Sequence, residues 1–259
     1  MSPVPNRRNG RAPLLGMLVL LSWAACASAA APDRYDAAVQ HAGRSDADHK
    51  RDAIDHPAEI LRLAGIREGM QVADVLAGDG YYSELASYLV GARGHVLLLN
   101  NAAFEKWSGG GWEPRLANGR LPNVEHRVAE LEHLQLGERA LDAVLLIKVY
   151  HDLYWKADRE ASWPGAETPA VLDALVRALK PGGVLVVVDH SAVAGSGRDE
   201  AGRLHRIDER YAVRDFESRG LHRIGSSDVL RRADDPRDQI SYKEPMIGKT
   251  DRFVLVFRK

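Results

Sequence analysis

The stretch that most constrains this chain spans residues 72–82, where a short apolar run gives way to a turn with two glycines and then to a helical pattern. Gly78 and Gly80 lack a Cβ atom, so the backbone can bend sharply there and let a ligand come close. A buried strand, a glycine turn and a helix N-terminus together make a binding site for a nucleotide-like ligand. Asp74 and Asp79 place carboxylates beside the turn. This arrangement suits a ligand with a cationic amino group and a ribose better than a pyrophosphate.

Further apolar runs of strand length alternate with helical patterns along the rest of the chain. Continuous runs of this kind suit parallel strands that are covered on both faces. We therefore predict an α/β protein with a Rossmann-like, doubly wound, mostly parallel seven-stranded sheet. The segment 231–251 is mostly charged and polar, which predicts that the last two strands pair antiparallel. After the first strand, which begins near Val72, the predicted strands are 94–101, 122–128, 141–147, 184–188, 221–230 and 252–257.

An N-terminal helical extension at 31–69 is predicted to precede a sheet domain at 70–259. Helix-spaced apolar residues near Tyr35 and in the segment 58–63 predict two helices in the extension. The charged segment 44–52 between them is interpreted as a solvated helix face. In the sheet domain, helices are predicted at 168–180 and 203–219.

Residues 1–30 are interpreted as a secretory signal peptide. A basic region at 7–11 precedes an apolar stretch at 14–25. That stretch is too short to span a bilayer, which needs about 20 apolar residues. Small residues then supply a cleavage site near Ala29 or Ala30. We expect the mature chain to be periplasmic or secreted, and an uncleaved membrane anchor is the alternative.

Charge and cysteine content exclude several kinds of partner. The formal net charge is −1, and the first thirty residues carry +3, so the remainder carries −4. A mildly acidic body has no electrostatic footprint for nucleic acid or an anionic membrane. We therefore expect no nucleic-acid partner, and no stable membrane insertion after signal cleavage. Cys26 is the only cysteine, and Trp23 stands where a lipid-attachment signal usually has leucine, so a lipoprotein is not expected.

The turn at 72–82 resembles the first motif of class I S-adenosylmethionine-dependent methyltransferases, in which an acid is followed by G-x-G-x-G. Asp74, Gly78 and Gly80 match that motif, and Leu76 stands where its first glycine is usual. The Leu-Lys-Pro-Gly-Gly turn at 179–183 and the antiparallel final strand are also typical of the family. The resemblance implies the fold predicted above, and S-adenosylmethionine as the cofactor.

More narrowly, the chain resembles a bacterial group of exported, predicted methyltransferases over most of residues 35–257. This resemblance implies transfer of a methyl group to an unidentified acceptor, expected to be a small molecule. In many proteins of this fold an acid ends the second strand and holds the ribose, and here Asn100 and Asn101 take that place. The resembling segments are 74–82, 100–101, 150–152, 189–191, 205–208 and 248–251. The residues expected to bind the cofactor are Asp74, Gly78, Asp79, Gly80, Tyr82 and Asn100.

Polar clusters follow the carboxyl ends of the later strands, where open parallel sheets bind their ligands. We predict His151 as the general base of the reaction, because a histidine titrates near neutral pH. Asp152 or Tyr150 is expected to orient His151 or the acceptor. The alternative is that His151 is a structural residue that caps the loop.

The later histidines allow a second interpretation. His190 and His205 are expected to hold the helix after the fifth strand in place. These histidines and nearby aspartates could instead form a metal site, because both residue types bind transition metals. No His-x-x-x-His spacing supports such a site, so no metal ligand is assigned. The residues of that alternative are His151, Asp189, His190, His205 and Asp208.

Three functions therefore compete. An exported methyltransferase is the first, although its cofactor is made in the cytoplasm. A non-catalytic periplasmic binding module with a degenerate methyltransferase fold is the second, and Leu76 and Asn100 favour it. A nicotinamide-dependent oxidoreductase is the third and least favoured. It lacks the third glycine of G-x-G-x-x-G, because Ser83 stands there, and it lacks the ribose acid.

Overall fold

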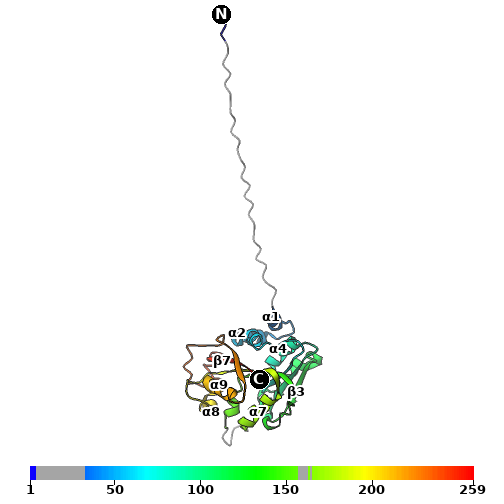
Figure 1. Ribbon diagram of the computed structural model, residues 1–259, viewed down its shortest axis with the longest axis vertical. Helices are drawn as coiled ribbons and strands as arrows, with labels where there is room; N and C mark the ends of the chain where they lie inside the picture. Colours follow the sequence, from blue (N-terminus) through cyan, green and yellow to red (C-terminus); the bar gives the residue numbers. More distant parts are fainter. Residues whose placement is uncertain (4–32, 157–162, 164) are drawn as a thin grey trace. The chain divides into compact units, whose positions relative to one another are not determined.

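The computed structural model describes residues 1–3, 33–156, 163 and 165–259 (Figure 1). The predicted signal peptide therefore falls almost wholly outside the described residues. The described residues between 33 and 259 form one compact unit that contains both the N-terminal helices and the sheet. Within the described residues, the structure contains no helix long and apolar enough to cross a bilayer.

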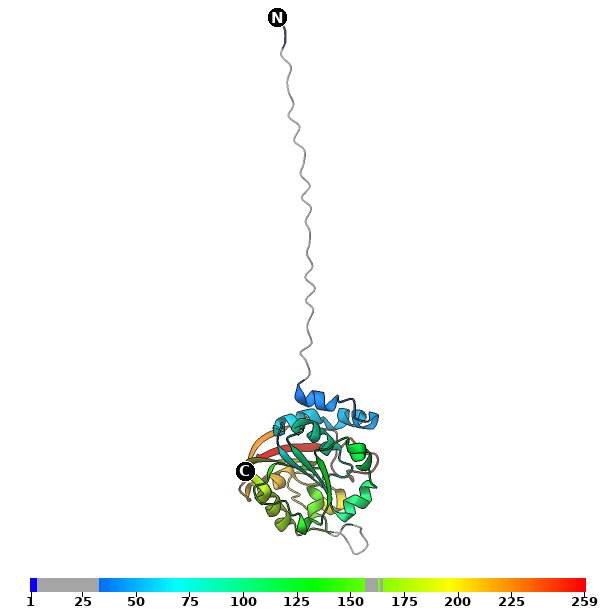
Figure 2. The same ribbon diagram turned by 90° about the vertical axis from the view of Figure 1, so that its right-hand side faces the viewer.

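A seven-stranded mixed sheet forms the centre of the unit, in the order β3-β2-β1-β4-β5-β7-β6. Strands β1 to β5 pair with one another in parallel, whereas β7 is antiparallel to both β5 and β6. In Figure 2 the red strand β7 runs through the sheet beside the orange segment that contains β6. The predicted fold class is thus confirmed. The strands are β1 (Gln71–Val75), β2 (His95–Asn100), β3 (Val124–Val128), β4 (Leu141–Ile147), β5 (Leu179–His190), β6 (His222–Ser227) and β7 (Arg252–Arg258).

Successive side chains of the central strands pack in two different hydrophobic clusters, because neighbouring side chains on a strand point to opposite faces of the sheet. On β1, Val72 packs in the cluster that contains residues of α1, α3 and α4. Its neighbour Ala73 packs in the other cluster, with residues of α7 and α9. Helices thus cover both faces of the sheet, which is why its central strands are continuously apolar. The helices are α1 (Arg34–Val39), α2 (Asp46–Asp55), α3 (Pro57–Ala64), α4 (Tyr81–Val90), α5 (Ala102–Ser108), α6 (Glu113–Leu116), α7 (Thr168–Ala178), α8 (Ala201–Leu204) and α9 (Glu209–Glu217).

Short 3-10 turns complete the fold at the strand ends. They are η1 (Ala117–Gly119), η2 (Leu131–His133) and η3 (His151–Tyr154). The turn η3 is the next element after β4, and it carries two of the three residues predicted to be catalytic.

The helix predicted at 203–219 is wrong, because two helices with a break between them occupy this segment. His205 ends α8 in the left-handed conformation, with φ at 51°. Ile207 then forms an isolated bridge with Ser191 beside the end of β5. The Asp208 carboxylate caps the next helix, α9, by accepting a hydrogen bond from the Arg210 backbone N–H. A capping acid inside an amphipathic pattern was therefore the sign of a new helix.

The charged segment 44–52 is only partly the solvated face that its composition predicts. Arg44 and Asp48 are buried, with exposed fractions of 6% and 5%. The Arg44 guanidinium donates to Asp52 at 2.6 Å, and Arg115 donates to Asp48 at 2.7 Å. Buried charges of this kind need paired partners, and one of these partners lies far away in the sequence. Charge composition alone therefore cannot distinguish this face from a solvated one.

Gly80 combines a positive φ with a close side-chain neighbour. Its φ of +78° suits glycine, and a Cβ added there would lie 2.5 Å from Leu98 Cδ1 on β2. Gly109, after α5, also has a positive φ of +57°, but a Cβ there would meet nothing within 4 Å. Comparing substitutions at the two positions therefore separates the cost of backbone strain from the cost of steric overlap.

We expect Gly80→Ala to destabilise the protein by about 3 kcal/mol or more, from left-handed strain and overpacking together. The matched variant Gly109→Ala should cost only about 1 kcal/mol, since it carries the backbone strain alone. Urea unfolding followed by circular dichroism measures both changes. Equal destabilisation by the two substitutions would show that the close approach of Leu98 adds nothing to the loss of stability.

Candidate functional site

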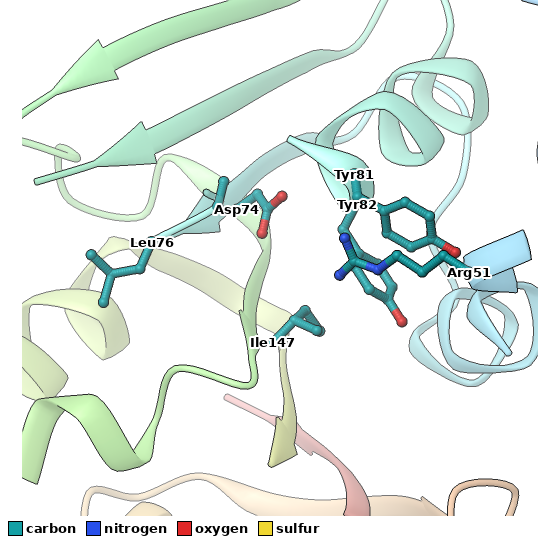
Figure 3. A pocket seen from close by; sticks show the side chains of 7 residues that line it. Arg51, Asp74, Leu76, Tyr81, Tyr82 and Ile147 are labelled. Carbon is teal, nitrogen blue, oxygen red and sulfur yellow. The ribbon is translucent and has the colours of Figure 1, made fainter. Parts of the chain in front are cut away.

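The turn between β1 and α4 has the backbone shape that the sequence predicts. Gly78 and Gly80 both have positive φ, at 61° and 78°. Leu76 also has a positive φ of 55°, in a place where the related motif has glycine. Its side chain is 3% exposed and belongs to the hydrophobic cluster of α7 and α9. Figure 3 shows it directed away from Arg51 and the two tyrosines of α4.

Asn100, which was expected to bind the ribose, bonds to the turn itself. Its side-chain oxygen accepts from the Gly78 N–H at 2.8 Å, and its side-chain nitrogen donates to the Gly78 carbonyl at 3.0 Å. The same nitrogen lies 3.2 Å from Glu105 Oε2 on α5. The amide is fully buried. In this conformation its hydrogen bonds hold the turn closed against the end of β2.

The segment around α5 and α6 covers the outer side of the turn. A Cβ added at Gly78 would lie 3.2 Å from the ring of Trp107, so the indole lies close against this glycine. A Cβ added at Gly111 would lie 3.1 Å from Asp79 Cβ. None of the residues of α5, all of which the structure describes, is buried. The cover is therefore made by a lightly packed helix.

The cavity at the turn has a volume of about 20 Å³. It is lined by Arg51, Asp74, Leu76, Ala77, Tyr81, Tyr82 and Ile147 (Figure 3). A space of this size holds about one water molecule, whereas pockets for small-molecule ligands measure about 300–1,000 Å³. S-adenosylmethionine, the cofactor that the fold implies, does not fit among these residues in the conformation described.

Asp79 and Tyr82, both predicted to bind the cofactor, have other neighbours. The Asp79 carboxylate lies 3.6 Å from Arg51 and 3.5 Å from Arg115. Arg51 also lies over the ring of Tyr81, with its guanidinium carbon 3.9 Å from the ring centre. Tyr82 is 3% exposed, and burial raises the pKa of its hydroxyl. Sequence reasoning missed both arginines, because each comes from a segment that the strand–turn–helix pattern does not include.

The residues predicted to be catalytic fall into two groups. Tyr150 is buried, and its hydroxyl donates to Asp215 of α9 at 2.6 Å, so it is turned toward the helix layer. His151 and Asp152 instead lie together, with His151 Nε2 3.2 Å from Asp152 Oδ1. The structure thus unites two of the three predicted residues, and their roles stay predictions.

Asp189, at the end of β5, orients His151. Its Oδ2 accepts from the His151 backbone N–H at 2.8 Å, and its Oδ1 lies 2.7 Å from His151 Nδ1. His151 Nε2 also lies 3.2 Å from Nδ1 of His205. Burial alone would lower the pKa of His151, but the carboxylates of Asp152 and Asp189 outweigh it and raise that pKa to about 10. A raised pKa favours the protonated imidazole, whereas a general base must be neutral.

Asp74, the acid of the motif, is buried inside β1 rather than open to a ligand. It is 2% exposed and accepts a hydrogen bond from Ser83 Oγ at 2.7 Å. Burial raises the pKa of its carboxyl to about 7, and the nearby charge of Asp79 adds to this. Between about pH 4 and pH 7 the folded protein therefore holds a proton that the unfolded chain releases. The free energy of unfolding must then decrease as the pH rises through this window.

We expect Asp74→Asn to remove that pH dependence, since an amide does not ionise. The stability of the variant relative to the wild type should increase by roughly 2 kcal/mol between pH 5 and pH 8. Thermal unfolding at several pH values measures the difference. Asp228→Asn is the control, because the Asp228 side chain is 93% exposed. Parallel curves for wild type and Asp74→Asn would show that this carboxyl is ionised throughout.

Comparison with known proteins relates the chain to methyltransferases. No family model matches the sequence. The ubiquinone/menaquinone biosynthesis C-methyltransferase UbiE of Pseudomonas syringae pv. syringae (strain B728a) is 31% identical over 132 residues, which are 51% of this chain and 46% of that protein. UbiE of Haemophilus ducreyi is 28% identical over 134 residues, 51% of this chain and 45% of that protein. The chain thus matches about half the length of these curated relatives.

Solved structures share the fold at low sequence identity. A SAM-dependent methyltransferase from Aquifex aeolicus superimposes with a TM-score of 0.57 at 21% identity, over 81% of this chain and 92% of that one. The cyclase SpnF superimposes with a TM-score of 0.59 at 14% identity, over 84% of each chain. At these identities the likeness establishes the fold and leaves the reaction open. The chain has the class I methyltransferase fold and is a distant homologue of S-adenosylmethionine-dependent methyltransferases.

Proposed function

We propose that this protein is an exported methyltransferase that moves a methyl group from S-adenosylmethionine to a small-molecule acceptor. The homology to C-methyltransferases supports the reaction class, and the preserved strand–turn–helix geometry supports the place where the cofactor would bind. The predicted signal peptide supports a periplasmic or secreted location. The resemblance to the exported bacterial group remains part of the same proposal.

The observation that best supports this proposal is the light packing of the segment that covers the turn. The glycine turn keeps its positive-φ backbone, while the segment that fills the space beside it is lightly packed. Trp107, which lies against Gly78, is 77% exposed. Displacing α5 therefore costs little buried apolar surface, and segments with few buried contacts are the ones that open most readily. We propose that this displacement opens the cofactor site.

A non-catalytic binding module is the second candidate function. The two hydrogen bonds between Asn100 and Gly78 favour it, because they keep the β2 end joined to the turn. Leu76 favours it as well, since its side chain is anchored in the core. In that case the fold would be retained as a scaffold, and the turn would stay closed to any nucleoside.

Calorimetric titration of the wild-type protein with S-adenosylhomocysteine, S-adenosylmethionine and NAD separates the two candidates. For the methyltransferase we expect micromolar binding of the first two ligands. Trp107→Ala should then bind S-adenosylhomocysteine about tenfold more tightly, because a larger fraction of the protein is open. Ile224→Ala is the control, since this exposed residue lies on β6.

Each result of this titration has a definite meaning. Weaker binding by Trp107→Ala than by wild type would show that the indole contacts the ligand instead of excluding it. A folded wild-type protein and a folded Trp107→Ala variant that both bind no ligand would contradict the methyltransferase and support the binding module.

A further inference from the structure

The two histidines His151 and His205 meet one carboxylate at the end of the sheet. His151 and Asp152 come from η3 after β4, and His205 follows α8. His151 Nε2 lies 3.2 Å from His205 Nδ1 and 3.2 Å from Asp152 Oδ1, and His205 Nδ1 lies 3.3 Å from the same oxygen. Three potential ligand atoms thus form a nearly equilateral triangle. They approach one another although their residues are 54 positions apart at the widest.

We propose that His151, Asp152 and His205 bind a divalent transition-metal ion. Two imidazoles and one carboxylate are a ligand set that suits first-row transition metals and leaves coordination positions open. Ligands held at about 2.0–2.1 Å in tetrahedral geometry lie about 3.3 Å from one another, which is the edge length of this triangle. An ion about 1 Å above the plane of the three atoms would satisfy all three distances. This proposal does not depend on the proposed methyl transfer.

Asp189 supports the site as a positioning residue. Histidine ligands typically donate their second ring N–H to a carboxylate, which fixes the tautomer and the direction of the ring. The Asp189 carboxylate takes that place at 2.7 Å from His151 Nδ1, and it also accepts from the His151 backbone N–H. The Nε2 lone pair of His151 is thereby directed at the other two ligand atoms. Asp189 is itself fully buried, so it holds this orientation firmly.

Two aromatic rings fix His205 on the outer side of the triangle. The ring centres of Trp155 and Tyr242 lie 4.9 Å and 4.7 Å from that of His205, both edge to face. Tyr242 is 54% exposed, so the site borders the surface on this side. The side chains of His205 and Asp152 are 13% and 10% exposed, so both retain some contact with solvent.

The remaining polar residues that the sequence suggested for a metal site have other partners. His190 Nδ1 lies 2.7 Å from the Thr250 hydroxyl, and the ring centres of His190 and His151 are 6.0 Å apart. Asp208 caps α9 and accepts from the Gly195 backbone N–H at 2.9 Å. The geometry therefore selects Asp152 as the carboxylate ligand, a residue that the sequence pattern did not place in this set.

Metal binding by the full chain, purified without a polyhistidine tag or added metal, tests the proposal. We expect one equivalent of Zn²⁺ in calorimetry with micromolar or tighter affinity, and Co²⁺ should give the visible absorption of a low-coordinate site. His205→Gln and Asp152→Asn should each weaken Zn²⁺ binding at least tenfold. Asp189→Asn should weaken it about 10- to 100-fold through the lost orientation of His151. His222→Gln, which removes an exposed histidine on β6, should bind like the wild type.

Circular dichroism shows which variants are folded, and X-ray absorption of the Zn²⁺-loaded wild type needs no variant. Two imidazole nitrogens and at least one oxygen around the ion would support the proposal. A folded wild type that takes up neither Zn²⁺ nor Co²⁺ would overturn it, leaving a hydrogen-bonded histidine–aspartate cluster. Equal Zn²⁺ binding by wild type and a folded His205→Gln or Asp152→Asn variant would also overturn it, since the ion would then bind elsewhere.

Discussion

One buried carboxylate, Asp55, joins segments that are far apart in the sequence. It lies at the end of α2 and accepts from Arg51 at 2.8 Å, from Lys148 at 3.0 Å and from Arg252. Lys148 follows β4 and Arg252 begins β7, so this cluster fixes the N-terminal helices to the sheet. Burial would raise the pKa of Asp55, but the three cations hold it well below its ordinary value. Breaking a buried pair of this kind costs about 3–5 kcal/mol, because the remaining charge is left without a partner.

The same cluster explains why the glycine turn is closed. Since Asp55 anchors α2, Arg51 extends from that helix over Tyr81 and toward Asp79, on the inner side of the turn. On the outer side, Trp107 lies against Gly78. The inner side is held by Arg51, which is paired with the buried Asp55, and the outer side by an exposed indole. If the site opens, the weaker outer side must therefore be the one that moves.

The strands could be predicted from the sequence because burial on both faces leaves a continuous apolar run. The predicted strand at 141–147 has the bounds of β4. Pairings between distant segments could not be predicted in this way, because their partners share no local pattern. Arg115, whose guanidinium meets Asp48 and Glu84, is one example. Asp189 is another, since only the parallel pairing of β4 and β5 brings it to His151.

The two candidate sites lie at different places on the carboxyl edge of the sheet. The turn and Asn100 follow β1 and β2, whereas the His151 cluster follows β4 and β5. Their hydrogen bonds share no residue: Asn100 bonds to Gly78 and Glu105, while His151 bonds to Asp189 and His205. Sites without shared partners usually contribute independently to stability and binding. The proposed cofactor site therefore depends on the geometry of the turn, and the histidine–aspartate cluster must be judged by its own geometry. This separation is why a cofactor titration and a metal titration address different properties of the molecule.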